Sequence, residues 1–422
     1  METKQTMMRK LADAVVRHKV GVLWGVFAGL YYIRFIRRPA GVTLYPIGAD
    51  ALLHNAPLET YAPGFTYPPL FAFLMIPFSP LPMWLRNLLW YVLLAGATWL
   101  CFRLCEQIAQ QTFAWRPEGR HRFWFRLLSV VLSLKVTLAV FENQAFDILV
   151  FLCLLFGLHG LMNRRSMVAA VGLAAAAALK VTPLLFFPYL LLRRQFKVFF
   201  LAVAVYAGIS FLPDLFFTPR GATSGYFVTW VRDVAGSAVF QKRSAEQVQV
   251  RHWDHASGLN QSLRSLVFQL TSEASGNRHS RMILNVVYLV YAALVFILLL
   301  RSARITNGFA LDSCLLLISM LMLSPMSSKS HFVVLMLPYM LLIAATMAEP
   351  SWRRLGITLL GFSFALITLT SRDIVGKRLS DTFLESGCVA IGTLMLLLLI
   401  IYIIFAWPGR SPSAACKESE RP

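Results

Sequence analysis

The sequence has little charge. Only 14% of its 422 residues are Asp, Glu, Lys or Arg, whereas a soluble protein averages about 25%. Its apolar residues, 57% of the chain, form blocks of roughly 15–25 residues, the length that crosses a hydrocarbon core of about 30 Å. These blocks do not alternate with a period of two, which favours helices over a closed barrel. The composition therefore excludes a soluble globular protein and predicts an all-α polytopic membrane protein.

Acidic residues are especially scarce, with 20 against 40 basic residues and a net charge of +20. The basic residues do not form a separate domain, so nucleic-acid binding is not expected. They cluster in short segments between apolar blocks, as the positive-inside rule predicts for cytoplasmic loops. The main clusters lie at residues 109–126, 164–165, 193–197, 301–304 and 353–354.

Cysteine and histidine give no sign of a metal or a disulfide framework. None of the six cysteines falls in a loop that we expect on the outer side of the membrane, and there is no Cys-x-x-Cys spacing. The pair in His252-Trp-Asp-His255 is too small a set of ligands to predict a metal site. No metal and no cofactor are expected.

Placing the basic clusters inside predicts about twelve transmembrane helices in one membrane-embedded domain, residues 1–422, with the core at 19–406. We expect these spans near residues 19–36, 83–107, 127–141, 145–163, 167–179, 183–193, 198–216, 283–302, 308–324, 332–348, 354–371 and 386–406. The main outer loops would be 37–82 and 217–282, and the tail 407–422 would be cytoplasmic. Residues 67–82 are apolar but broken by proline, which favours a helix in or dipping into the outer leaflet. If this segment spans instead, the orientation of all later spans is reversed.

Short polar islands interrupt the apolar blocks, and this topology places all of them on the outer side. They are residues 67–69, 142–144, 180–183, 260–264 and 324–331. Polar groups at membrane depth are costly and usually mark a site. Their convergence predicts a cavity open to the outer face.

The sequence of these islands resembles glycosyltransferase family 87, whose members have the GT-C architecture. The motifs are Gly64-Phe-Thr-Tyr-Pro-Pro-Leu-Phe71, Ala178-Leu-Lys-Val-Thr-Pro-Leu-Leu-Phe186, Asn260-Gln-Ser-Leu-Arg264 and Ser324-Pro-Met-Ser-Ser-Lys-Ser-His331. They occur in the family's order, and the resemblance covers about residues 40–345.

The resemblance implies transfer of a hexose, most often mannose, from a polyprenyl-phosphate carrier to a lipid or glycan acceptor, with inversion. It implies an all-helical GT-C fold with an outer-face cavity, in the plasma (inner) membrane of the cell. The active site would face the extracytoplasmic side. The partners would be the polyprenyl-phosphate sugar, the acceptor and membrane lipids.

One family feature is missing. Members usually carry an Asp just after the first span as the catalytic base, and that position falls on Gly41, or on Thr43 with a shifted gap. The nearest carboxylates are Asp50 and Glu59. Either of them could deprotonate the acceptor hydroxyl, although Asp50 could equally lie on the solvated face of an interfacial helix.

The remaining candidates are suggested by the chemistry of a departing lipid phosphate and a bound sugar. Lys180, Arg264 and Lys329 could bind phosphate, and each could instead neutralise carbonyls, form a loop salt bridge or reach the interface. His331 could contact phosphate or sugar, or lie at a helix end bonded to the backbone. Asn260 and Gln261 could bond sugar hydroxyls or cap a helix, and Tyr67 suits the headgroup level. Asp147 could be stabilised by the helix N-terminus that it begins, or it could have a role in the cavity.

Two other functions share part of this pattern. A lipid-linked sugar flippase or other transporter would also show broken helices and charges at membrane depth, but the two related halves typical of transporters are not found. A family member without catalytic activity would keep the motifs and lack the Asp.

Overall fold

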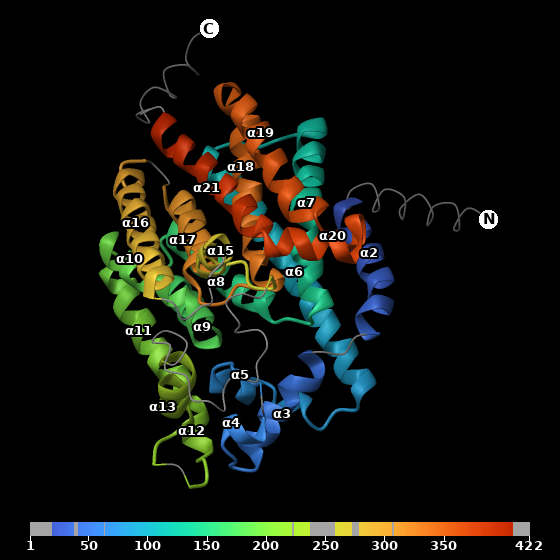
Figure 1. Cartoon of the computed structure of the whole chain (residues 1–422), viewed down its shortest axis with the longest axis vertical. Coiled ribbons are helices and arrows are strands. Elements are labelled where there is room, and N and C mark those ends of the chain that lie inside the picture. The colour runs from blue at the N-terminus through green and yellow to red at the C-terminus, as the bar shows by residue number, and fades with distance from the viewer. Residues whose placement is uncertain are drawn as a thin grey trace, which may run out of the picture.

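The chain folds as a bundle of helices in a computed structural model (Figure 1). The structure describes residues 19–37, 41–62, 64–221, 223–236, 258–271, 278–305 and 308–407, and every regular element in them is helical. The His252–His255 pair and nearly all of the tail fall outside these residues. The predicted all-α class is therefore confirmed for the described chain.

Six helical segments are long and apolar enough to cross a membrane among the described residues. They are α6 (Met83–Phe113), α7 (Gly119–Glu142), α16 (Arg278–Ser302), η6 with α18 (Lys329–Leu335 and Met336–Ala348), η7 with α19 and η8 (Pro350–Trp352, Arg353–Phe364 and Ala365–Leu369), and α21 (Cys388–Ala406). They make this a multi-pass membrane protein.

The other predicted spans also coincide with helices, but these are shorter or less apolar. They are α2 (Lys19–Ile36), α8 (Asp147–Met162), α9 (Ser166–Leu179), η2 with α10 (Thr182–Leu185 and Phe186–Leu192), α11 (Phe196–Ser210) and α17 (Phe309–Leu323). A 14-residue helix such as α9 is only about 21 Å long at 1.5 Å per residue. The count of twelve spans therefore stays a prediction.

Several very short helices gather at one end of the bundle, at the bottom of Figure 1. They are α3 (Gly41–Leu53), α4 (Leu58–Tyr61), α5 (Pro69–Leu74), η1 (Ile76–Phe78), α12 (Leu212–Phe216) and α13 (Tyr226–Trp230), with η3 (Val231–Ala235) following. Among the described elements, α15 (Leu263–Leu270) precedes α16, and α20 (Arg372–Glu385) lies between η8 and α21. The predicted helix within residues 67–82 covers Pro69–Phe78, about 15 Å of rise and too short to span.

The helices α8 and α9 form a closely packed hairpin. A Cβ on Gly172 would lie 2.5 Å from the Gly157 nitrogen and 2.7 Å from the Cys153 carbonyl oxygen. A Cβ on Gly160 would lie 2.5 Å from the Ala169 nitrogen. The two backbones touch because the contact residues are small, which is how membrane helices pack most closely. Since the helices are antiparallel, the start of α8 lies beside the end of α9.

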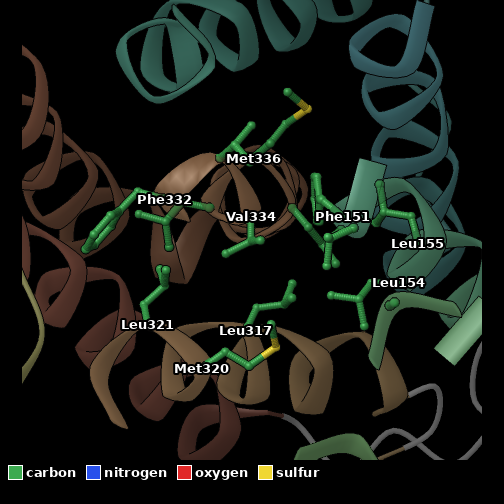
Figure 2. Close-up of a cluster of buried hydrophobic side chains, with 14 of the residues drawn as sticks. Phe151, Leu154, Leu155, Leu317, Met320, Leu321, Phe332, Val334 and Met336 are labelled. Carbon is green, nitrogen blue, oxygen red and sulfur yellow. The ribbon is translucent and has the colours of Figure 1, made fainter. Parts of the chain in front are cut away.

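A cluster of buried apolar side chains joins α8, α17 and η6 with α18 (Figure 2). Phe151, Leu154 and Leu155 come from α8, and Leu317 and Leu321 come from α17. All five are 3% exposed or less. The cluster fixes how far apart these three elements lie, close to the polar segments at their ends.

The side chain of Gln144 fastens the first loop to the turn between α7 and α8. Its Oε1 accepts from the Val42 nitrogen at 3.0 Å, and its Nε2 donates to the Phe35 carbonyl at 3.3 Å. Its own carbonyl accepts from the Tyr45 hydroxyl and the Trp90 indole at 3.2 and 2.9 Å. Because Gln144 is fully buried, no water can replace these bonds.

We expect Gly172→Ala to destabilise the protein by about 1–3 kcal/mol, the usual cost of overpacking, because its methyl group would meet backbone atoms that cannot move aside. The measurement is the thermal midpoint of the detergent-purified protein by tryptophan fluorescence. Gly96→Ala is the matched control, since nothing lies within 4 Å of its Cβ. Equal midpoints for the two variants would contradict the proposed role of this contact.

Gln144→Ala should also cost about 1–3 kcal/mol, because buried backbone groups of the first loop lose their partners. The neighbouring Asn143 is exposed, so Asn143→Ala in the same unfolding assay serves as the control. A Gln144→Ala protein as stable as the control would show that the first loop is held by other contacts.

Candidate active site

Three polar side chains from separate parts of the chain meet at the ends of short helices. Lys180 Nζ donates to Asp147 Oδ1 at 2.5 Å, and His331 Nε2 lies 3.8 Å from the same oxygen. The side chain of Asp147 is 9% exposed, that of Lys180 is 23% and that of His331 is 21%. The group is therefore largely shielded from solvent.

The local sequence explains each position. Asp147 is the first residue of α8, where the helix dipole favours a negative charge. Lys180 follows the last residue of α9 in an extended conformation, and Thr182-Pro183 then opens the 3₁₀ segment η2. Proline cannot continue α9 and disfavours helix in the residue before it. The predicted break at Lys180 is thus present, and the α8–α9 hairpin brings the two charges together.

A small cavity of about 20 Å³ lies beside this group, enough for about one water molecule. Its polar walls include Thr182, Ser324 and Ser327, together with Asp147, Lys180 and His331. Its apolar wall is formed by Val150, Met320, Leu321 and Val334. Met320, Leu321 and Val334 also belong to the cluster in Figure 2. The lining of the cavity thus has an apolar part, which we call its floor, and a charged part, which we call its rim.

Tyr67 lies next to this group within an aromatic cluster. Its ring is 4.9 Å from that of Phe146 and 5.6 Å from that of Tyr45, measured between centroids. Burial raises the pKa of the Tyr67 phenol to about 12, and the negative charge of Asp147 acts in the same direction. The Tyr67-Pro68-Pro69 segment thus covers the start of α8.

Asn260 holds the loop that precedes His331, whereas the side chain of Gln261 bonds to the end of α20 and the start of α21. Asn260 Oδ1 accepts from the Ser327 nitrogen at 3.0 Å, and its Nδ2 donates to the Pro325 carbonyl at 3.0 Å. Gln261 Nε2 donates to the Leu384 carbonyl, and its Oε1 accepts from the Val389 nitrogen. Both residues are 1% exposed, so their amides bind backbone of this chain.

Arg264 and Lys329 do not line the cavity. Arg264 lies on α15, is 4% exposed and has its guanidinium 6.0 Å from the centre of the Phe268 ring. Lys329 begins η6 two residues before His331. The structure therefore brings Lys180 and His331 together but places these two cations elsewhere.

The two carboxylates of the first loop are also outside the cavity lining. Asp50, on α3, accepts a hydrogen bond from the Ser79 hydroxyl just after η1. Glu59 is half-buried in the first turn of α4. Their roles as the base remain predictions. Asp147, expected from the sequence at a helix start, is the carboxylate that lines the cavity in the described part of the chain.

Position 41 leaves no room for the missing acidic side chain. A Cβ on Gly41 would lie 2.7 Å from the Tyr45 ring and 2.8 Å from the Gln144 carbonyl oxygen. The sequence does not indicate the contacts of Gln144 with Tyr45 and Phe35, because these residues lie 99 and 109 positions away from it along the chain. The only signal for Asp147 was an acidic residue at the edge of an apolar block.

Comparison with known proteins identifies the family. No curated protein and no solved structure matches the chain. The sequence model of glycosyltransferase family 87 matches residues 65–325, more than half of the chain. The match includes the first motif from Phe65 onward, the second and third motifs, and the first two residues of the fourth, Ser324 and Pro325. The chain therefore belongs to glycosyltransferase family 87, and with its apolar helices it is a multi-pass membrane glycosyltransferase.

Proposed function

We propose that this glycosyltransferase moves a hexose, with mannose as the first candidate, from a polyprenyl-phosphate donor to a lipid or glycan acceptor on the extracytoplasmic face. The observation that carries the proposal is the Asp147–Lys180–His331 group beside a cavity with an apolar floor. A polyprenyl phosphate presents a charged group joined to a long apolar chain. This combination of charged rim and apolar floor fits that chemistry.

In an inverting transfer, the acceptor oxygen forms a bond to the anomeric carbon while the bond from that carbon to the phosphate oxygen breaks. The electron pair leaves with the phosphate, and the acceptor proton passes to a carboxylate. Lys180 and His331 are the groups that we assign to the phosphate or sugar, since fixed cations and donors stabilise a departing anion.

We assign the role of base to Asp147, because it is in the cavity lining. In the free enzyme Lys180 neutralises it. A donor phosphate that takes over Lys180 would leave the carboxylate without its counter-ion and so make it a stronger base. Asp50 and Glu59 are the alternative bases, and Tyr67 would bound the site on the side of the first loop.

The cavity of about 20 Å³ is far smaller than a hexose, so donor binding must widen it. Two of its walls are irregular backbone, namely the break at Lys180 and the 3₁₀ segment η6. Irregular backbone at membrane depth is tolerated where it lines a wet cavity. We propose that these two segments move when the donor binds and the cavity widens.

The base assignment is tested by transfer from radiolabelled polyprenyl-phosphate sugars to extracted membrane lipids and glycans. We expect Asp147→Asn to lower the rate by about 10²–10⁴-fold, as loss of a general base does, while Glu118→Gln, an exposed carboxylate, retains the wild-type rate. Asp147→Asn leaves Lys180 without its carboxylate partner. The double variant Asp147→Asn with Lys180→Gln also removes this unpaired positive charge, so it should fold but stay inactive.

Full activity in Asp147→Asn would overturn the assignment. Loss of transfer in Asp50→Asn or Glu59→Gln alone would move the base to the first loop. Binding of a donor without product from the wild-type protein would identify a member without catalytic activity, and movement of an intact donor across vesicles would identify a flippase.

Donor affinity tests the phosphate site separately. We expect Lys180→Ala to weaken donor binding by about 10–100-fold, the usual value of a charge-assisted hydrogen bond. Lys197→Ala, an exposed lysine on α11, should have no effect. Because Arg264 does not line the cavity, Arg264→Ala should weaken donor binding less than Lys180→Ala. Unchanged affinity in Lys180→Ala would remove it from the phosphate site.

A further inference from the structure

A second group of cations lies on the other side of η6 from His331. In a 3₁₀ helix successive residues are about 120° apart, so Lys329 and His331 point in different directions from η6. His331 faces Asp147 and Lys180. Lys329 lies close enough to Lys135, Glu142 and Arg372 for their charges to act on it.

Lys135 and Arg34 share two carboxylates at this place. Lys135 Nζ lies 2.9 Å from Asp373 and 3.5 Å from Glu142, and Arg34 Nη2 lies 3.1 and 2.9 Å from the same two residues. The hydrogen bond from Lys135, followed by that from Arg34, holds the pKa of Asp373 below its usual range. Arg34 on α2 and Lys135 on α7 thus form ion pairs with both carboxylates.

Lys329 is the cation left over. Arg372 pairs with Asp381 at 3.8 Å, whereas Lys329 has no hydrogen bond or ion pair to any residue that the structure describes. The group contains four cations and three carboxylates, which leaves one positive charge in excess. The cations are Arg34, Lys135, Lys329 and Arg372, and the carboxylates are Glu142, Asp373 and Asp381. A half-buried ammonium without a partner is costly and is favourable where an anion binds.

The surroundings of this group favour a lipid as the source of the anion. The helix α20 lies across the bundle in Figure 1 and is kinked at Gly376. Ile374 before the kink and Leu379 and Phe383 after it are exposed beside its charged residues. Apolar side chains on a charged crosswise helix are typical of a helix at the membrane interface. A headgroup at that level would reach Lys329 while its acyl chains stay in the hydrocarbon.

We propose that Lys329, with Lys135, Arg34 and Arg372, forms a second anion site that binds the phosphate of an anionic membrane lipid, separate from the Lys180–His331 cavity. Within the proposed function, this site would hold a phosphate-bearing lipid acceptor by its headgroup. The binding itself does not depend on that function, because it requires no sugar donor and no transfer.

The test measures the binding of short-chain phosphatidic acid to the purified full chain in the absence of donor. Binding is measured by native mass spectrometry and by calorimetry. Phosphatidylcholine and inorganic phosphate are the comparison ligands. We expect Lys329→Gln to weaken phosphatidic acid binding by about tenfold or more. The thermal midpoint should be no lower than that of the wild type, because Lys329 has no ion pair to lose among the described residues. Lys377→Gln, an exposed lysine on α20, is the matched control and should bind like the wild type.

Asp373→Asn gives a prediction of opposite sign. It frees Lys135 and Arg34 from a competing carboxylate, so phosphatidic acid should bind several-fold more tightly. Lys180→Ala should leave this binding unchanged even if it abolishes transfer, which separates the two proposals. Equal affinity in Lys329→Gln and Lys377→Gln would overturn the site, and equal affinity for inorganic phosphate and phosphatidic acid would overturn its assignment to a lipid.

Discussion

The ion pair between Asp147 and Lys180 is the interaction on which the geometry of the site depends. Each charge sits at the end of a short helix within an apolar layer, where an unpaired charge is strongly destabilising. The two can meet only because Gly157 and Gly172 let α8 and α9 touch along their backbones. Small residues away from the cavity therefore control the position of its charged rim.

The same requirement explains the other buried charges of the bundle. Arg193 binds Asp312 between α10 and α17, and Arg126 binds Glu106 between α7 and α6. These pairs join helices and do not line the cavity beside Asp147, so their role is to fix packing. Lys180 and Lys329 differ from them. The first shares its carboxylate with a histidine at a cavity, and the second has no carboxylate of its own among the described residues.

The sequence predicts well the features that depend on local properties. The length of the apolar blocks indicated the helices, and Pro183 indicated the break after α9. It could not predict contacts that depend on the direction of a side chain in the fold. The place of Asp50 along the first loop makes it a candidate base, yet α3 turns it toward Ser79. Asn260 and Gln261 have the right chemistry for sugar hydroxyls, but distant backbone groups use it.

The filled position at Gly41 bears on where the base lies. The Gln144 carbonyl that leaves no room for a side chain there also accepts bonds from Tyr45 and Trp90. An Asp at position 41 and this fastening of the first loop are therefore mutually exclusive in this chain. Asp147 follows Gln144 by three residues in the same tight turn. The Gln144 contact thus excludes a carboxylate at position 41 and anchors the turn that carries Asp147. This makes Asp147 the carboxylate to examine before those of the first loop.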